Sequence, residues 1–398
     1  MSKFKFATGM ACLIIGAALP LSAQYTATQD GDLVHLQDAK NHTVVSIITS
    51  MGNIAYEMKV NGTNVLYFPS AIDDFRQRGG LAGIPFQAPW SNRLDEPAFY
   101  ANGKRYAFNP EMTTVRVSNP MAGFLTSARQ WQVVEVKADA NEAWVTSRLD
   151  YYRHPEWMAE FPFAQTYEMT YRLRDGVLEV HLKIQNLSTD PLPVSIGFHP
   201  IYHLTDSPRE DWTISVGART QWILSPATIP TGVTQPIEKF FPDPRNVALK
   251  DYVLDHVFSD LIRDGSGRAA MSVKGKTQKL DLIYGPKYLA SVVWSPGSNA
   301  FATSIPPERG GRTPQPPAPI NPGQAVGASG GGGRAGAQGR SGGRGGGAFA
   351  DPNFVAFEPM AAITDAMNLA QKGLYKELQY IPPGGVWEES FWVHPSGF

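Results

Sequence analysis

From residue 25 onward, hydrophobic and polar positions follow the two-residue repeat of β-strands. In residues 177–184, Val177 and the charged or polar side chains at odd positions share one face, and apolar side chains at even positions share the other. This pattern predicts a half-buried antiparallel strand. The Asp175-Gly176 pair before it predicts a tight hairpin turn to a second alternating segment, residues 166–171.

Further short segments have the same character. Residues 43–48 are rich in β-branched side chains, residues 143–147 alternate, and residues 289–294 and 354–357 are typical of core strands. Few long segments have the helical period. Because many short strands are separated by Gly, Pro and Asn, the sequence predicts an all-β fold, a β-sandwich.

One long segment, about residues 304–349, departs from this pattern. It is rich in Pro and then in Gly and Arg, and it has almost no large apolar side chains to offset the entropy of ordering. Core-like strands flank it, and the roughly fifty residues that follow are too few for an independent domain. We therefore expect a single domain over residues 24–398, with a disordered insertion in one loop. Its arginines would suit RNA, but the expected export from the cell disfavours this alternative.

The amino-terminal residues 1–23 are typical of a signal peptide. Lys3 and Lys5 precede an apolar stretch, and a small residue, Ala23, offers a cleavage point. The alternative is an uncleaved anchor, but the stretch is shorter than the ~20 apolar residues that a spanning helix needs. We expect a periplasmic or secreted protein with no stable membrane insertion after cleavage. The only cysteine, Cys12, lies in this stretch, so the mature chain has no disulfide and no thiol nucleophile.

Composition excludes some partners. The chain has 398 residues, 42% of them hydrophobic, which is enough for a sizeable core. Its 35 basic and 36 acidic residues give a net charge of −1, which indicates neither nucleic acid nor an anionic membrane as a partner.

Two titratable side chains stand on strand-like segments. In residues 193–200, His199 shares a face with Ser195 and Gly197, whose small size leaves room for a ligand. The alternative is a histidine hydrogen-bonded at a sheet rim; His203 is a weaker candidate. Glu358 ends an apolar run, where neighbouring apolar groups would raise its proton affinity and suit a general base. Its alternative is the solvated end of a strand.

Two loop or strand-end segments supply polar groups. Asn92 and Arg93 follow a Pro- and Trp-containing stretch, and the five donors of the Arg93 guanidinium match sugar hydroxyls or a carboxylate. Asp255, next to His256, lies at the edge of an apolar run. A solvated arginine and a polar strand end are the respective alternatives.

Taken in order, these segments resemble the motifs of the aldose 1-epimerase family, the galactose mutarotases. The resemblance runs from about Tyr25 to the carboxyl terminus, outside the insertion. It rests on residues 83–93, 102–106, 197–202, 254–258 and 357–360, the last followed by Thr364-Asp365.

The resemblance implies a large antiparallel β-sandwich of the galactose mutarotase type, with the site in a groove on one sheet. It implies that Glu358 is the general base and His199 the acid of an aldose 1-epimerase, while Arg93, Asp255 and Asn92 hold sugar hydroxyls. The substrate would be a free or terminal sugar whose α and β anomers interconvert by ring opening and closing. It implies no cofactor and no metal.

One departure from the family pattern matters. Ala122 stands where many members carry a further histidine, and losing such a donor costs roughly a few kcal/mol of transition-state stabilisation. His154 is the residue that would compensate. The local arginine of the sugar-phosphate branch is also absent, with Thr126 nearby. Two alternatives stay open: a non-catalytic carbohydrate-binding protein, which Ala122 favours, and a glycoside hydrolase or lyase that uses Asp255 and Glu358 as its two carboxylates.

Overall fold

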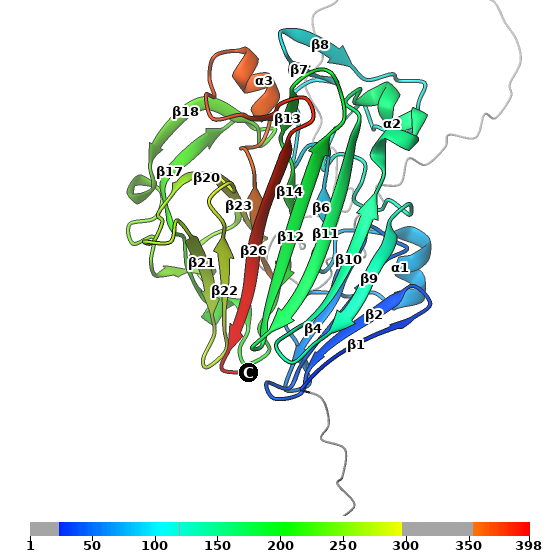
Figure 1. Cartoon of the computed structure of the whole chain (residues 1–398). Coiled ribbons are helices and arrows are strands. Elements are labelled where there is room, and N and C mark those ends of the chain that lie inside the picture. Colours follow the sequence, from blue (N-terminus) through cyan, green and yellow to red (C-terminus); the bar gives the residue numbers. More distant parts are fainter. Residues whose placement is uncertain (1–23, 119, 297–352) are drawn as a thin grey trace, which may run out of the picture.

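The computed structural model describes residues 24–118, 120–296 and 353–398, and β-strands dominate it (Figure 1). The predicted signal peptide and the predicted insertion lie outside the described residues. None of the helices in the described ranges is long and apolar enough to cross a membrane.

A nine-stranded sheet forms one layer, and its long central strands lie side by side across the front of Figure 1. All pairings between its strands are antiparallel. In spatial order the strands are β19 (Val247–Ala248), β16 (Thr213–Ser215), β21 (Ala269–Lys274), β22 (Lys279–Tyr284), β26 (Val386–Ser396), β12 (Val177–Asn186), β11 (Gln165–Arg174), β10 (Ala143–Leu149) and β9 (Gln132–Ala138).

The opposite layer is an eight-stranded antiparallel sheet. Its strands are, in spatial order, β18 (Pro230–Pro236), β17 (Ala218–Leu224), β20 (Leu254–Leu261), β23 (Ala290–Ser295), β24 (Val355–Met360), β14 (Gly197–Phe198) and β6 (Phe86–Gln87), and β15 (Ile201–Tyr202) also pairs with β24. Because β23 and β24 are adjacent and antiparallel, the chain leaves and re-enters the sheet at one end of this strand pair.

A five-stranded sheet extends this second layer. It consists of β1 (Tyr25–Asp30), β2 (Leu33–Asp38), β3 (Thr43–Ile48), β4 (Ile54–Val60) and β5 (Thr63–Asn64). The backbone N–H of Tyr67, just after β5, donates to the carbonyl of Ile201 in β15 over 2.8 Å. This hydrogen bond joins the five-stranded sheet to the eight-stranded one.

The remaining elements are short. Two small sheets pair β7 (Ala98–Ala101) with β8 (Lys104–Ala107) and β13 (Leu192–Val194) with β25 (Gln379–Ile381). The helices are α1 (Ile72–Arg78), α2 (Pro155–Glu160) and α3 (Ala366–Gln371), with 3₁₀ turns η1 (Tyr151–Arg153), η2 (Arg209–Asp211), η3 (Ile237–Lys239) and η4 (Leu249–Asp251).

Aromatic side chains fill the space between the two layers. The Phe198 ring of β14 lies 4.9 Å from that of Phe391 in β26, and the Phe86 ring of β6 lies 5.4 Å from that of Tyr167 in β11. Each such contact contributes about 0.5–1.5 kcal/mol beyond the area it buries. The predicted all-β antiparallel sandwich is therefore confirmed. The single-domain boundaries stay a prediction.

The local strand predictions match the structure closely. In β12 the even-numbered side chains are buried and the odd-numbered ones are partly exposed. Asp175 and Gly176 both have positive φ, 49° and 73°, as a two-residue hairpin turn requires.

Residues 193–200 do not form one continuous strand, contrary to the sequence prediction. Only Gly197 and Phe198 of this segment belong to the eight-stranded sheet, while Pro193 and Val194 in β13 pair with β25. The predicted division into two faces nevertheless holds, because Val194, Ile196 and Phe198 all lie in the main core.

The outer face of the eight-stranded sheet, away from the nine-stranded sheet, carries the candidate site. Strand alternation places Asp255, Trp294 and Glu358 on this face. The residue that precedes each of them in its own strand points into the main core, namely Leu254, Val293 and Phe357. Part of the face is covered by the chain that follows β24, including Leu369 of α3.

Candidate active site

Glu358 lies in the middle of β24 and is almost fully buried, with 1% of its surface exposed. Burial raises the pKa of the Glu358 carboxyl well above its usual range, and the negative charge of Asp255 adds to the rise. The positive charge of Arg93 and a long hydrogen bond from Asn92 both lower the pKa of Glu358, but they do not offset this rise. The alternative, the solvated end of a strand, is thus excluded, and the pKa of the carboxyl is raised in the direction predicted from its apolar run.

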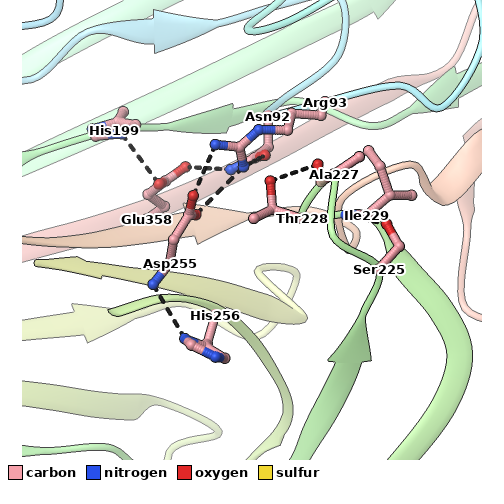
Figure 2. A network of polar contacts seen from close by, with 10 residues as sticks. All are labelled: Asn92, Arg93, His199, Ser225, Ala227, Thr228, Ile229, Asp255, His256 and Glu358. Atoms are coloured by element: carbon pink, nitrogen blue, oxygen red, sulfur yellow. Dashed lines mark hydrogen bonds and ion pairs between the residues drawn. The ribbon is translucent and has the colours of Figure 1, made fainter. Parts of the chain in front are cut away.

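His199 follows β14 directly and faces Glu358. Its Nε2 atom lies 3.2 Å from Oε1 of Glu358, and only 7% of its surface is exposed (Figure 2). Burial lowers the pKa of His199 to about 4. The Trp294 ring stands edge-on to the imidazole, with ring centres 5.3 Å apart.

Burial therefore favours the neutral form of both partners. A neutral imidazole beside a protonated glutamic acid has one transferable proton, which lies on the carboxyl. An imidazolium beside a carboxylate has the same total number of protons, with the transferable one on the ring. In the neutral pH range we interpret the Glu358–His199 pair as holding a single proton. One acid and one base are then available, whichever residue carries the proton.

Asn92 connects this pair to the rest of the site. Its Nδ2 lies 3.5 Å from Oε2 of Glu358, and its Oδ1 accepts a hydrogen bond of 2.9 Å from Nη1 of Arg93. Its backbone is left-handed, with φ of 54°, which asparagine tolerates better than most residues. The buried Gln87 stabilises this turn, because its Oε1 accepts the Asn92 backbone N–H over 2.7 Å. The sequence motif predicts Asn92 as a sugar ligand; here both ends of its amide contact protein groups.

Arg93 and Asp255 form the more open end of the site. The guanidinium donates through Nη2 to Oδ2 of Asp255 over 2.8 Å and through Nη1 to Oδ1 over 3.4 Å (Figure 2). About a quarter of each side chain remains exposed. The pair therefore presents a fixed donor and a fixed acceptor to a ligand on the outer face of the sheet.

The structure thus brings together all five residues predicted from the motifs, from β24, β20, the segment after β6 and the end of β14. Trp294 and Gln87 belong to the same site, although the motifs do not predict them. The alternation in β23 could have identified Trp294. Trp294 lies on the same face of the sheet as Val292, and Val292 is the cross-strand neighbour of Glu358. Gln87 carries no comparable signal.

Three other candidates have different surroundings. The His154 and Trp157 ring centres lie 4.0 Å apart, and Nδ1 of His154 lies 3.6 Å from Oε1 of Glu156; compensation for Ala122 by His154 stays a prediction. His203 hydrogen-bonds the carbonyl of Asn64 over 2.8 Å. Ala122 adjoins the site, because its N–H donates to the Asn92 carbonyl over 2.7 Å.

No group of three or more His, Asp or Glu side chains in the described ranges is arranged to hold a metal ion.

Asp365, next to α3, is a second buried carboxyl. It is 1% exposed, and its Oδ1 accepts hydrogen bonds from the Asp95 backbone over 3.2 Å and from Asn368 over 2.9 Å. Burial, together with the nearby Asp95 charge, raises the pKa of Asp365 from 3.8 to about 8.

This shift predicts a pH-dependent loss of stability. Between pH 4 and pH 8 the folded chain binds a proton at Asp365 that the unfolded chain releases, so the free energy of unfolding falls as pH rises. Asp365→Asn removes this contribution. Relative to wild type, we expect the variant to gain stability progressively from pH 4 to pH 8, by roughly a few kcal/mol in total. Urea unfolding across this range measures the difference, and Asp30→Asn, at an exposed aspartate, is the matched control. A constant difference at every pH would contradict the prediction.

Comparisons with known proteins agree with the fold. A family model described as aldose 1-epimerase matches residues 32–324. A galactose mutarotase-like protein from Clostridium acetobutylicum is similar in structure, with a TM-score of 0.70, 17% identity and coverage of 94% of this chain and 98% of that one. A galactose 1-epimerase from Lactobacillus acidophilus has a TM-score of 0.63 at 12% identity, covering 94% and 98%. An aldose epimerase homologue from C. elegans has a TM-score of 0.60 at 12% identity, covering 90% and 97%.

Proposed function

Because the chain belongs to the aldose 1-epimerase family, we propose that it is a mutarotase that interconverts the α and β anomers of a free or terminal sugar. The observation that carries the proposal is the buried contact between Glu358 and His199, 3.2 Å apart. A pair that shares one proton supplies the acid and the base that ring opening needs.

The proposed reaction begins with the sugar lying on the outer face of the eight-stranded sheet. Binding shifts the shared proton to His199, because the anomeric hydroxyl hydrogen-bonds the Glu358 carboxylate. Glu358 takes the proton of that hydroxyl while the bond between the anomeric carbon and the ring oxygen breaks. His199 gives its proton to the ring oxygen, which becomes a hydroxyl of the open-chain aldehyde.

Ring closure reverses these transfers. After rotation about the bond between the first and second carbons, the same hydroxyl attacks the other face of the aldehyde. His199 takes the proton of this hydroxyl, and Glu358 returns its proton to the carbonyl oxygen, so the pair regains its starting protonation. Each positioned acid or base contributes on the order of 10²- to 10⁴-fold.

The other residues hold the sugar and the base in place. Arg93 donates to sugar hydroxyls and Asp255 accepts from them, while Asn92 keeps Glu358 and Arg93 in a fixed relation. Trp294 excludes water beside His199 and offers an apolar surface to the ring.

The direct test follows freshly dissolved α-glucose and α-galactose to anomeric equilibrium by polarimetry or NMR. We expect the protein to accelerate the approach in proportion to its concentration. If neither these nor other aldoses respond while sugar binding is measurable, the mutarotase proposal is wrong.

The pair's protonation predicts the pH dependence of kcat/KM. Because the pKa of His199 is lowered to about 4, activity should persist through weakly acidic pH and fall only as pH drops through about 4, when both partners are protonated. At high pH, activity should fall as the pair loses its remaining proton. Rates measured from pH 3.5 to 9, corrected for the spontaneous reaction, give the profile. An acidic limb near pH 6.5 would show that His199 titrates as an exposed histidine does.

A non-catalytic carbohydrate-binding protein is the second candidate. Ala122 is the observation that favours it, because its side chain supplies no donor beside Asn92. Calorimetric binding of sugars without anomer exchange would support this reading. For a glycoside hydrolase, Asp255 is poorly suited, since both of its carboxylate oxygens already contact Arg93.

We also propose that the protein works outside the cytoplasm, in the periplasm or secreted, on a small-molecule sugar. The support is the signal-like pattern of residues 1–23. Amino-terminal sequencing of the mature protein from fractionated cells tests this, and a mature chain that still begins at Met1 would contradict it.

A further inference from the structure

A cavity of about 500 Å³ adjoins the candidate site and shares Arg93 with it. We call it the Arg93–Lys372 cavity, after two of the residues that line it. Neither Glu358 nor His199 is among its lining residues, so it lies beyond the place where the anomeric carbon must sit.

The close-up shows how the cavity and the site are arranged. His199, Glu358 and the Arg93–Asp255 pair follow one another across Figure 2, and the loop residues Ser225 to Ile229 lie on the far side of Arg93 from His199. This loop joins β17 to β18, and Ser225, Ala227 and Ile229 line the cavity. A ligand that extends from the acid–base pair past Arg93 therefore enters the cavity.

The charges that line the cavity are balanced. Lys372 forms an ion pair with Asp95, Glu96 pairs with Arg105 over 2.7 Å, and Arg93 pairs with Asp255. A phosphate or carboxylate ligand would have to compete with these acidic partners for the cations. A neutral ligand meets no such competition.

The rest of the lining mixes hydroxyl groups with apolar surface. Ser118, Ser225 and Thr231 supply hydroxyls, and proline, leucine and isoleucine side chains supply flat or broad apolar patches. This combination suits a sugar ring, which has a polar rim and apolar faces. The volume lies within the range of about 300–1,000 Å³ found for small-molecule sites.

We propose that the Arg93–Lys372 cavity is a second sugar subsite and that the preferred substrate is the reducing end of a disaccharide or short oligosaccharide. The reducing unit lies between His199 and Arg93, and the next unit fills the cavity. This inference rests on the proposed mutarotase function. It assigns the substrate's size, which the acid–base pair does not determine.

The test compares mutarotation of single sugars with that of reducing disaccharides. Glucose is measured beside four disaccharides that all have glucose as the reducing unit. In maltose, cellobiose and lactose the second unit is attached at the 4-hydroxyl, and in melibiose at the 6-hydroxyl. For at least one disaccharide we expect kcat/KM about 10-fold or more above that of its own reducing monosaccharide. Equal or lower values for all the disaccharides would overturn the subsite.

Variants that fill the cavity make the test specific. Ala227 and Ser118 are exposed residues on different segments of the lining, and Ala227→Trp or Ser118→Trp should remove the disaccharide advantage while preserving the monosaccharide rate. Val134→Trp, at an exposed position of the edge strand β9, is the matched control and should change neither rate. Equal loss with both kinds of substrate in both cavity variants would contradict the proposal.

Failure of the function and failure of the subsite give different results. If no sugar of either size is accelerated, the mutarotase proposal fails. Calorimetric titration of wild type, Ala227→Trp and Val134→Trp with the same disaccharides then tests the cavity alone. Binding that is weaker in Ala227→Trp and unchanged in Val134→Trp supports the subsite. Equal binding by all three proteins overturns it.

Discussion

Glu358→Gln is expected to lower kcat for mutarotation by about 10²- to 10⁴-fold. Glutamine has nearly the same shape and keeps an oxygen that can accept from Asn92, but its amide cannot take the anomeric proton. The loss should therefore appear in kcat, with sugar binding changed much less. Polarimetry with α-glucose and α-galactose, at several substrate concentrations, separates kcat from KM.

Two controls connect this loss to the chemistry. Glu238→Gln, at an exposed position in η3, removes one carboxyl elsewhere and should leave kcat unchanged. The thermal midpoint of Glu358→Gln should not fall, since the variant removes a buried group whose charged form is disfavoured. A stable variant that keeps more than a tenth of wild-type kcat would show that Glu358 is not the base.

Arg209→Met is expected to lower the free energy of unfolding by about 3 kcal/mol or more. Arg209 is 1% exposed, and its guanidinium donates to the backbone carbonyls of Leu249, Tyr252 and Ser295 and to the Ser295 hydroxyl. Methionine fills similar space but leaves these buried acceptors without their donor, at about 1–3 kcal/mol each. Urea unfolding followed by circular dichroism measures the change.

The position of Arg209 extends its effect to the site. Ser295 ends β23, and its hydroxyl, which accepts from Nε of Arg209, donates to the carbonyl of Phe354, just before β24, the strand that carries Glu358. We therefore expect Arg209→Met to lower activity near the unfolding midpoint in parallel with stability. Arg219→Met, at an arginine 58% exposed and paired with Asp260, is the control and should cost less than about 1 kcal/mol. A similar small loss for Arg209→Met would contradict the prediction.

Much of the local structure could be predicted from sequence because it depends on neighbouring residues. Alternation in residues 177–184 predicts both the strand and its buried face, and Asp175-Gly176 predicts the hairpin turn. The segment 193–200 could not be predicted in the same way. Its alternation is regular, but pairing with two different partners, β25 and β6, divides it.

The candidate site could be predicted as a set of residues but not as an arrangement. The order of motifs along the chain identifies Asn92, Arg93, His199, Asp255 and Glu358, and the structure places them in one network. Nothing in the motif around Asn92 shows that its amide contacts Glu358, which is 266 positions away in the chain.

The sequence by itself therefore determined the family, the all-β class and the set of candidate site residues, because periodicity and motif composition are local properties. Only the tertiary structure decided the direction in which the pKa values of Glu358 and His199 shift, since those shifts depend on burial by strands distant in the chain. It also decided that Trp294 faces His199 and that a cavity opens beyond Arg93. Those properties depend on which side chains surround a point in space, and strand pairing, rather than sequence proximity, determines that.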